Sequence, residues 1–243
     1  MQNDRWLTSK EITLTVCFSA LYFVFAFVPI SPLVGLPGKA ITLAAILAPI
    51  MGIVLGPRLG LLSCLLGGIL GFFGGIFSPP SLVSGATASV CAGLLRANRR
   101  ELCAFLYFLM LFFFGFYPFV GPVWLFPAVM WLQVAGLLIL VSPIQSIAIR
   151  NLEAHNPRIL LAFFVTCLTS TLAGQIAGSL TFEIISWPVF LADANAWRFN
   201  WQTLTFMYPI ERLVIALAAS GIGVVLFMVL TAANLMPFKR RRS

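Results

Sequence analysis

The sequence predicts an all-α fold, a polytopic bundle of six to eight transmembrane helices with both termini in the cytoplasm. Of its 243 residues, 60% are hydrophobic and only 9% are charged, whereas a soluble domain carries about 25% charged residues. Apolar runs recur along the chain at the length of about 20 residues that a helix needs to cross the hydrocarbon core. Lys and Arg fall in short clusters between these runs. We therefore expect a single transmembrane domain over residues 1–243.

Glycine and proline divide the apolar part of the chain into eight segments that we expect to be helices. Proline lacks a backbone donor and restricts the residue before it, so Gly56-Pro57, Pro79-Pro80 and Gly121-Pro122 are expected helix boundaries. The expected segments are 11–29, 40–56, 58–76, 80–96, 101–121, 123–149, 158–187 and 208–236. Because segment 80–96 is short and polar at its start, whether it spans the membrane fully stays open.

The positions of Lys and Arg predict how these segments are oriented. Cytoplasmic loops of membrane proteins carry an excess of Lys and Arg. With the N-terminus in the cytoplasm and the segments alternating in direction, all of the 15 basic residues except Lys39, Arg198 and Arg212 lie on the cytoplasmic side. The distribution predicts a multi-pass protein of the cell (plasma) membrane with cytoplasmic N- and C-termini.

Composition and motifs also exclude several classes of protein. The net charge of +8 could indicate nucleic-acid binding, but the basic residues follow the expected topology, so no nucleic-acid partner is expected. The five cysteines lie in apolar runs and His155 is the only histidine, so neither a metal site nor another cofactor is expected. The sequence contains no GxSxG, HExxH or GxxxxGK[ST] motif, which predicts neither an enzyme nor a chain that hydrolyses ATP by itself.

The few polar groups within the segments are the candidates for function, because burying such groups in lipid is costly. One stripe consists of Thr171, Gln175, Ser179 and Glu183. These residues are spaced by four and therefore share one helix face. The stripe runs from the middle of the membrane to the outer surface, where Glu183 lies about one turn from the expected helix end.

Three further polar side chains are expected near this stripe. Gln133 lies near the middle of its segment, and Glu211 and Arg212 open the last segment on the outer side. Two interpretations stay open. Glu183 and Arg212 could form a structural ion pair near the membrane interface. Alternatively, they face an outward cavity that holds a polar solute, together with Gln133 and Gln175.

The outer loop expected between the last two segments is rich in aromatic and polar residues. Its candidate binding residues are Trp187, Trp197, Arg198, Trp201 and Tyr208. Aromatic anchors at the membrane interface explain the tryptophans without a ligand. In the other interpretation, the loop is a lid whose rings stack on a flat ligand. The loop 29–39, which ends at Lys39, would then form the opposite wall.

Three stretches near the two ends of the chain form a pattern known from one family of membrane proteins. Residues 36–45 begin with Leu-Pro-Gly-Lys, residues 49–60 contain a Gly-Pro-x-x-Gly hairpin, and residues 208–212 read Tyr-Pro-Ile-Glu-Arg. With these stretches the chain resembles the membrane-embedded, substrate-binding S components of energy-coupling factor (ECF) vitamin transporters. Members of that family usually have six helices, so an extra hairpin over 101–149 would account for the eight segments expected here.

The resemblance implies a function and a set of partners. An S component binds a small water-soluble micronutrient at the outer face and takes it up with a transmembrane coupling protein and two ATPase subunits. The positions that match the binding regions of the family are Lys39, Glu183, Trp187, Trp197, Arg198, Trp201, Tyr208, Glu211 and Arg212. With Gln133 and Gln175, they make up the predicted ligand site, in contact with the solute and surrounded by membrane lipid. A stand-alone ion-coupled transporter or channel, and a membrane enzyme or assembly scaffold, stay open as alternatives.

Overall fold

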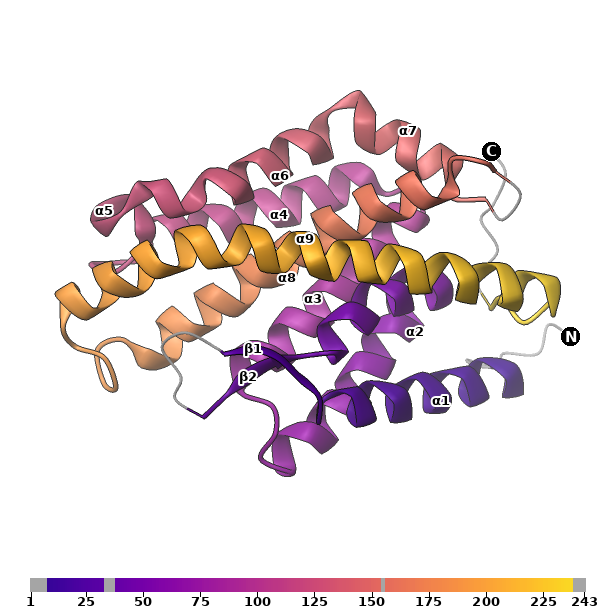
Figure 1. Cartoon of the computed structure of the whole chain (residues 1–243), viewed down its shortest axis with the longest axis horizontal. Coiled ribbons are helices and arrows are strands. Elements are labelled where there is room, and N and C mark those ends of the chain that lie inside the picture. Colours follow the sequence, from indigo (N-terminus) through magenta and orange to yellow (C-terminus); the bar gives the residue numbers. More distant parts are fainter. Residues whose placement is uncertain (1–7, 33–37, 154–155, 238–243) are drawn as a thin grey trace, which may run out of the picture.

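The structure, a computed structural model, describes residues 8–32, 38–153 and 156–237, and most of these residues lie in helices (Figure 1). The helices are α1 (Ser9–Phe25), α2 (Ala44–Phe73), α3 (Pro79–Arg96), α4 (Arg100–Gly115), α5 (Pro122–Leu125), the 3-10 helix η1 (Pro127–Met130), α6 (Trp131–Val141), α7 (Pro143–Asn151), α8 (Ile159–Ser186) and α9 (Ala194–Ala232). Two short strands, β1 (Pro29–Pro32) and β2 (Ala40–Thr42), pair antiparallel. The predicted all-α class is confirmed, whereas this small strand pair was not predicted.

The first helix is shorter than the predicted segment 11–29. It begins with a capping box, in which the Thr8 side chain accepts from the Glu11 N–H and the Glu11 carboxylate accepts from the Thr8 N–H at 2.8 Å. It ends at Phe25, because Pro29 and Pro32 favour the extended conformation of β1.

The predicted segments 40–56 and 58–76 form the two arms of α2, which turns sharply at Gly56. Gly56 has φ 84° and ψ 175°, a left-handed conformation that glycine adopts readily. The arms fold back on each other, since a Cβ atom built on Gly60 would lie 3.1 Å from the Cα of Gly52. Eight residues of straight helix would separate these positions by about 12 Å. The predicted reversal is therefore present, although the first arm starts only after β2.

α3 packs tightly against this reversal, and its bounds match the predicted segment 80–96. A Cβ atom on Gly93 would lie 2.5 Å from the Cα of Pro57, and one on Gly52 would lie 2.1 Å from the carbonyl oxygen of Ser89. Contacts this close require glycine, and small residues are typical of closely packed helices in membranes.

The predicted helix 123–149 is broken, and the preceding one ends at Gly115 instead of residue 121. The region of the predicted helix 123–149 consists of α5, η1, α6 and α7. Three of these four helices begin at a proline, and the N–H that proline lacks interrupts the hydrogen-bond ladder. The axes of Pro127–Val141 and Pro143–Asn151 differ by 65°. Arg100 covers this bend, because its guanidinium donates to the Ser142 carbonyl at 3.2 Å and to the Ser146 hydroxyl.

The last helix starts 14 residues before the predicted position 208. α9 is capped by the Asp193 carboxylate, which accepts from the Asn195 N–H at 2.9 Å. Pro209 therefore lies inside α9, and the predicted outer loop from Trp187 to Tyr208 is mostly helix. This part of the prediction was wrong.

The early start of α9 has a physical reason. Trp197, Trp201 and Leu204 recur at helical spacing, and all three are buried. Their common apolar face packs against the bundle. That packing keeps this stretch helical, although the residues on its other face are polar. Only Pro209 indicated a boundary, and the structure accommodates it within the helix.

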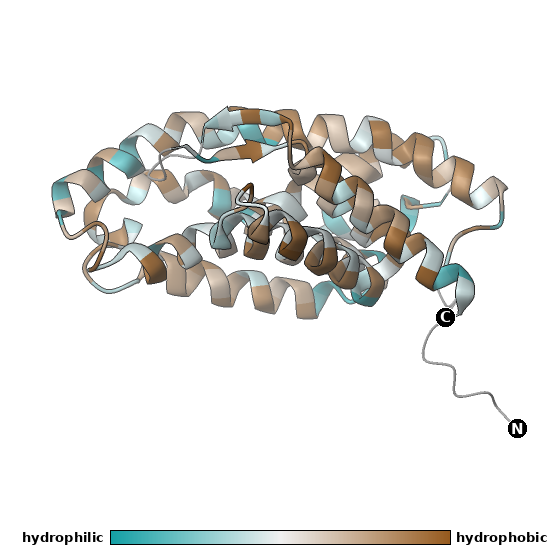
Figure 2. Cartoon of the chain, turned by 90° about the horizontal axis from the view of Figure 1, so that it is seen from below, coloured by the Kyte–Doolittle hydropathy of each residue, from teal (hydrophilic) through white to brown (hydrophobic). Residues whose placement is uncertain are grey.

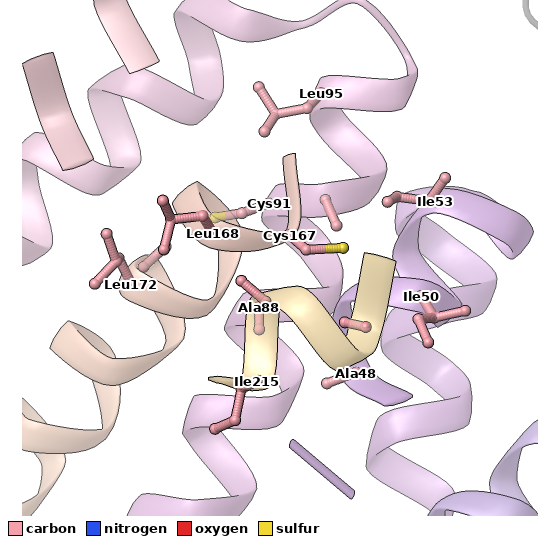
Figure 3. Packing of buried hydrophobic residues seen from close by; sticks show 14 of the residues in the cluster. Ala48, Ile50, Ile53, Ala88, Cys91, Leu95, Cys167, Leu168, Leu172 and Ile215 are labelled. Carbon is pink, nitrogen blue, oxygen red and sulfur yellow. The ribbon is translucent and has the colours of Figure 1, made fainter. Parts of the chain in front are cut away.

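α8 occupies the middle of the bundle. Its buried side chains meet those of α2, α3 and α9, and Figure 3 shows this core around Ala48, Ile50, Ala88, Cys167 and Leu172. The bounds of α8 agree with the predicted segment 158–187. Several of its polar side chains are buried as well, so the most enclosed helix also carries polar groups into the interior.

The outer faces of the helices are strongly apolar. Large side chains such as Phe105, Phe112, Leu217 and Val225 are exposed, and Figure 2 shows apolar residues along the outer helices. An exposed apolar surface of this extent is typical of a protein that meets lipid. Within the described residues, α2, α8 and α9 are long and apolar enough to cross a membrane, and the bent pair Pro127–Val141 and Pro143–Asn151 adds a fourth candidate if it counts as one span.

The two ends of the bundle differ in character. At one end, which we call the basic end, Lys10 of α1 donates to the Asn234 carbonyl just after α9. Arg96 lies at the same end, 5.0 Å from the centre of the Phe227 ring of α9, and donates to the Leu152 carbonyl. The opposite end, which we call the pocket end, comprises the two strands, the α2–α3 turn and the C-terminal end of α8.

Candidate functional site

A pocket opens between α2, α3, α8 and α9, with β2 forming part of its cover. Its cavity volume is about 80 Å³, which accommodates a few water-sized groups. The aromatic residues in its wall are Tyr22, Phe77, Phe182, Trp201 and Tyr208. The polar ones include Ser81, Ser84, Thr171, Gln175, Ser179 and Arg212. A mostly apolar wall with a few polar groups is typical of a small-molecule site.

α8 brings part of the predicted polar stripe to this pocket. Thr171, Gln175 and Ser179 line it, because their spacing places them on one helix face. The Thr171 hydroxyl donates to the Cys167 carbonyl of the same helix at 2.8 Å. The Thr171 hydroxyl is thus engaged within its own helix.

Gln175 is held by a second buried glutamine, Gln133 of α6. In the amide orientation that satisfies both of its polar atoms, the nitrogen of Gln133 donates to the carbonyls of Val129 at 2.8 Å and Met130 at 3.2 Å, and its oxygen accepts from the Gln175 amide nitrogen at 3.0 Å. The Gln175 oxygen, which we call the open acceptor, has no hydrogen-bond partner among the described residues. Gln133 therefore does not line the pocket itself, but it orients the glutamine that does.

Arg212 of α9 brings a charged group to the pocket. One of its terminal nitrogens donates to the Glu211 carboxylate at 2.8 Å, with both side chains buried. Its Nε, which we call the open donor, is buried without a hydrogen-bond partner in the described part of the chain. Of the two interpretations left open for Glu183 and Arg212, the structural ion pair is absent from the described residues, because Arg212 pairs with Glu211.

Glu183 is fully buried just beyond the pocket wall. It follows Phe182 and lies one turn after Ser179, both of which line the pocket. Neither of its carboxylate oxygens has a hydrogen-bond partner in the residues that the structure describes. Burying a carboxylate without a partner costs free energy, so Glu183 lowers the stability of the folded protein at the pocket end.

The tryptophans of α9 form a packed cluster instead of a mobile lid. The Trp197 indole N–H donates to the Leu191 carbonyl at 2.8 Å, and the Trp201 indole N–H donates to the Val120 carbonyl at 2.9 Å. The two rings are 5.6 Å apart, and Phe182 lies 5.1 Å from Trp197. Because both indoles are buried, neither is an anchor at the membrane interface. Only Trp201 also lines the pocket.

A second cavity, of about 290 Å³, lies next to the pocket. It is lined by Lys39, Gly75 and Ser186, and it shares Phe77, Pro80 and Phe182 with the pocket. Lys39, one of the predicted binding residues, donates to the Gly75 carbonyl at 2.5 Å. We call this second cavity the entrance, for its place beside the pocket at the pocket end.

The predicted site residues therefore fall into three groups. Lining the pocket are Gln175, Trp201, Tyr208 and Arg212, and lining the entrance is Lys39. Neither cavity is lined by Gln133, Glu183, Trp187, Trp197, Arg198 or Glu211. Of these, Trp187 packs on Phe119 with ring centres 6.2 Å apart, and Arg198 is exposed on α9.

Sequence reasoning missed the wall contributed by α1 and α3. Tyr22 reaches so close to α3 that a Cβ atom on Gly85 would lie 1.9 Å from its hydroxyl. Ser81, Ser84, Gly85 and Ala88 line the pocket from α3. Their spacing of three and four residues places small side chains on one helix face, and that pattern in the sequence could have indicated this wall.

Comparison with family models, with curated proteins and with solved structures finds no match for this chain. Within residues 8–32, 38–153 and 156–237, no group of three or more His, Cys, Asp or Glu side chains is arranged to hold a metal ion. The pocket and its open acceptor and donor are therefore the features of the molecule that indicate a function.

Proposed function

We propose that the protein is a multi-pass membrane protein that binds a small water-soluble solute, a vitamin-like micronutrient, in this pocket. One observation carries the proposal: Gln175 and Arg212 line the same small pocket, and each has a buried polar atom without a hydrogen-bond partner among the described residues. Buried polar atoms are nearly always hydrogen-bonded in folded proteins. A solute that pairs with both atoms would supply the hydrogen-bond partners that the described residues do not provide.

The pocket end faces the outside of the cell in this proposal. The basic end carries Lys10, Arg58, Arg96 and Arg100, and an excess of Lys and Arg favours a cytoplasmic position. Both ends of the chain would then be cytoplasmic. Six to eight segments would cross the membrane; the first arm of α2, residues 44–55, rises only about 18 Å, short of the hydrocarbon core of about 30 Å.

Uptake would follow the scheme of an ECF transporter, in which this chain is the S component. A solute larger than a few water molecules has to separate the walls of the cavity, and β2 is the short element among them. Because the sequence lacks a phosphate-binding loop, the energy for release into the cell would come from partners. These are a transmembrane coupling protein and two ATPase subunits.

The experiment that tests this function is native mass spectrometry of the protein purified gently from its membrane. We expect a bound small molecule with the unaltered protein and at least about tenfold weaker retention with Arg212→Ala, because a buried hydrogen bond to a charged group is lost. Glu183→Ala tests in the same way whether that carboxylate belongs to the site. Arg198→Ala, which changes an exposed arginine of the same helix, serves as the control.

An unaltered protein that carries no solute, or an Arg212→Ala variant that retains it fully, would contradict the proposal. Both variants should be checked for intact folding by their thermal unfolding in detergent. If Arg212→Ala retains the solute while a substitution in another part of the chain abolishes its retention, the binding site lies in that other part.

One observation favours a second function, a stand-alone ion-coupled transporter. Glu183 is a fully buried carboxylate without a hydrogen-bond partner among the described residues, and such groups in membranes often bind protons or other cations during transport. Solute uptake by liposomes that contain this chain alone, abolished by Glu183→Gln, would support this function. Uptake only in the presence of an ATPase would exclude it.

A further inference from the structure

The basic end carries an excess of positive charge that the pocket end lacks. In the described residues, its seven basic and three acidic side chains are Lys10, Arg58, Arg96, Arg99, Arg100, Arg150 and Arg158, against Glu11, Glu101 and Glu153. The charged side chains of the pocket end are Lys39, Arg198 and Arg212, against Glu183, Asp193 and Glu211. Opposite charges therefore balance at the pocket end, whereas the basic end has a net charge of +4 in the described part of the chain.

Four exposed arginines account for this excess. We call them the arginine patch, and they are Arg58, Arg99, Arg150 and Arg158. The less exposed Arg96 and Arg100 donate to groups of the protein itself. Within the residues that the structure describes, no guanidinium of the arginine patch takes part in an ion pair or a side-chain hydrogen bond. Their charges are therefore accessible to a partner outside the bundle.

The fold gathers the arginine patch from three turns that are far apart in the sequence. The reversal of α2 lies against α3, because a Cβ atom on Gly93 would be 2.5 Å from the Cα of Pro57. Arg96, in the last turn of α3, donates to the Leu152 carbonyl just after α7. The α3–α4 turn directly follows Arg96. The α2 reversal, the α3–α4 turn and the α7–α8 turn thus lie together at the basic end.

Each arginine of the patch lies next to an exposed aliphatic side chain of the same helix. These aliphatic residues are Leu62, Leu102, Ile147 and Leu161, all of them exposed and each three or four positions from its arginine. This spacing places both side chains on the same helix face. The second arm of α2, α4 and α8 begin at the basic end, and α7 ends there. In all four helices the aliphatic residue is therefore the one farther from the basic end.

This arrangement places the arginine patch at one level of a membrane. The exposed aliphatic side chains meet lipid chains, as the outer faces of the bundle do. The arginines follow about one helical turn, or 5 Å, beyond them. That level is the border of the hydrocarbon core, where the phosphates of the headgroups lie and where long basic side chains place their charge. A soluble acidic protein would not require apolar side chains beside every arginine.

We infer that the arginine patch binds the phosphate groups of anionic phospholipids in the leaflet beside the basic end. A guanidinium can donate two parallel hydrogen bonds to a phosphate. Each basic side chain near an anionic membrane surface strengthens the attraction by about fivefold. The inference does not depend on a solute in the pocket, because the arginine patch lies at the other end of the bundle.

Competition between two lipids tests the inference. The purified full-length protein, freed of lipid in a nonionic detergent, is incubated with equal amounts of phosphatidylglycerol and phosphatidylcholine of the same acyl chains. Native mass spectrometry then counts the lipids of each kind that stay bound. We expect a preference for phosphatidylglycerol of more than about tenfold. Raising the salt from about 0.1 M to 1 M should lower this preference, because it shortens the Debye length from about 10 Å to 3 Å.

A variant that changes all four arginines of the patch to glutamine tests the residues. The preference should fall by at least about tenfold, because four charges near the phosphates are lost. Arg198→Gln is the control, since it removes an exposed arginine at the pocket end, and it should keep the full preference. The basic residues 239–242 stay unchanged in every variant, so the comparison isolates the arginine patch.

Thermal unfolding in detergent checks that the variants fold. If the fourfold variant does not fold, two double variants replace it, Arg58→Gln with Arg99→Gln and Arg150→Gln with Arg158→Gln. Each should lower the preference by at least about fivefold.

Equal binding of the two lipids by the unaltered protein would overturn the inference. A preference that folded patch variants keep in full, or that Arg198→Gln loses as strongly, would also overturn it. Polyglutamate is the last probe. If it binds through the arginine patch while the lipids are bound equally, the patch recognises an acidic protein instead of phospholipid.

Discussion

Gln145 of α7 and Gln175 of α8 are both buried glutamines, but the two regions around them use their polar groups differently. Gln145, toward the basic end, donates to Thr166 at 3.5 Å and accepts from Thr169 at 3.1 Å. Gln175, toward the pocket end, is bonded through its nitrogen alone within the described residues. The difference separates polar groups that hold helices together from polar groups that are prepared for a ligand.

The same contrast extends to the charged residues. At the basic end, Arg96 and Arg100 donate to backbone carbonyls where the chain changes direction. At the pocket end, Arg212 keeps its open donor, and Glu183 is buried without a hydrogen-bond partner in the described part of the chain. Satisfied groups should be sensitive to substitution in stability, and unsatisfied groups in binding.

The largest effect is expected at a close helix contact near the basic end. Gly93→Ala places a methyl group 2.5 Å from the Cα of Pro57, and backbone atoms cannot move aside cheaply, so we expect a loss of about 3 kcal/mol. Gly221→Ala is the control, because a Cβ atom there meets no described atom within 4 Å. Thermal unfolding in detergent measures both. Equal stability of the two variants would show that this contact is looser than the structure has it.

A smaller loss is expected when the bend between α6 and α7 loses its support. Arg100→Met removes the hydrogen bonds to Ser142 and Ser146 and should cost about 2 kcal/mol. Arg58→Met alters an exposed arginine and should change stability by less than about 0.5 kcal/mol. If Arg100→Met unfolds at the same denaturant concentration as the unaltered protein, the basic end is not held by these bonds.

A gain in stability is expected at the pocket end. Glu183→Gln replaces a buried carboxyl group that lacks a partner among the described residues by a neutral amide of the same shape, so the melting temperature should rise by about 2–4 °C, equivalent to about 1 kcal/mol. Glu101→Gln on the exposed surface of α4 is the control. A fall in melting temperature would mean that the Glu183 carboxylate stabilises the fold. The two ends would then not differ in whether their charged groups contribute to stability.

Much of the helical framework could be predicted from the sequence, because lipid imposes a strong pattern on it. The length of apolar runs located α3 and α8 to within two residues, and Gly56-Pro57 indicated the reversal within α2. The break of segment 123–149 was foreseeable only in part. Prolines mark the positions where it bends, but the direction of each bend depends on contacts such as that of Arg100.

The site could be predicted less completely, because its parts come from helices far apart in the chain. Helical spacing indicated that the α8 stripe shares one helix face, and Thr171, Gln175 and Ser179 of that stripe line the pocket in the structure. Arg212 stood out as a charge in an apolar helix. The tryptophans were misplaced because Pro209 was interpreted as the start of the last helix. Which amide atom of Gln175 is left without a partner depends on Gln133, a tertiary contact that sequence spacing does not contain.

The most direct test of the account is whether the pocket opens to the exterior. In intact cells, Ser84→Cys in the pocket wall should react with a membrane-impermeant maleimide added outside, and added solute should slow the reaction. The controls are Asn195→Cys at the exposed start of α9, which should react from outside, and Glu153→Cys near the basic end, which should react only after permeabilisation. Labelling of Ser84→Cys from the cytoplasmic side alone, or from neither side while Asn195→Cys reacts, would contradict the account.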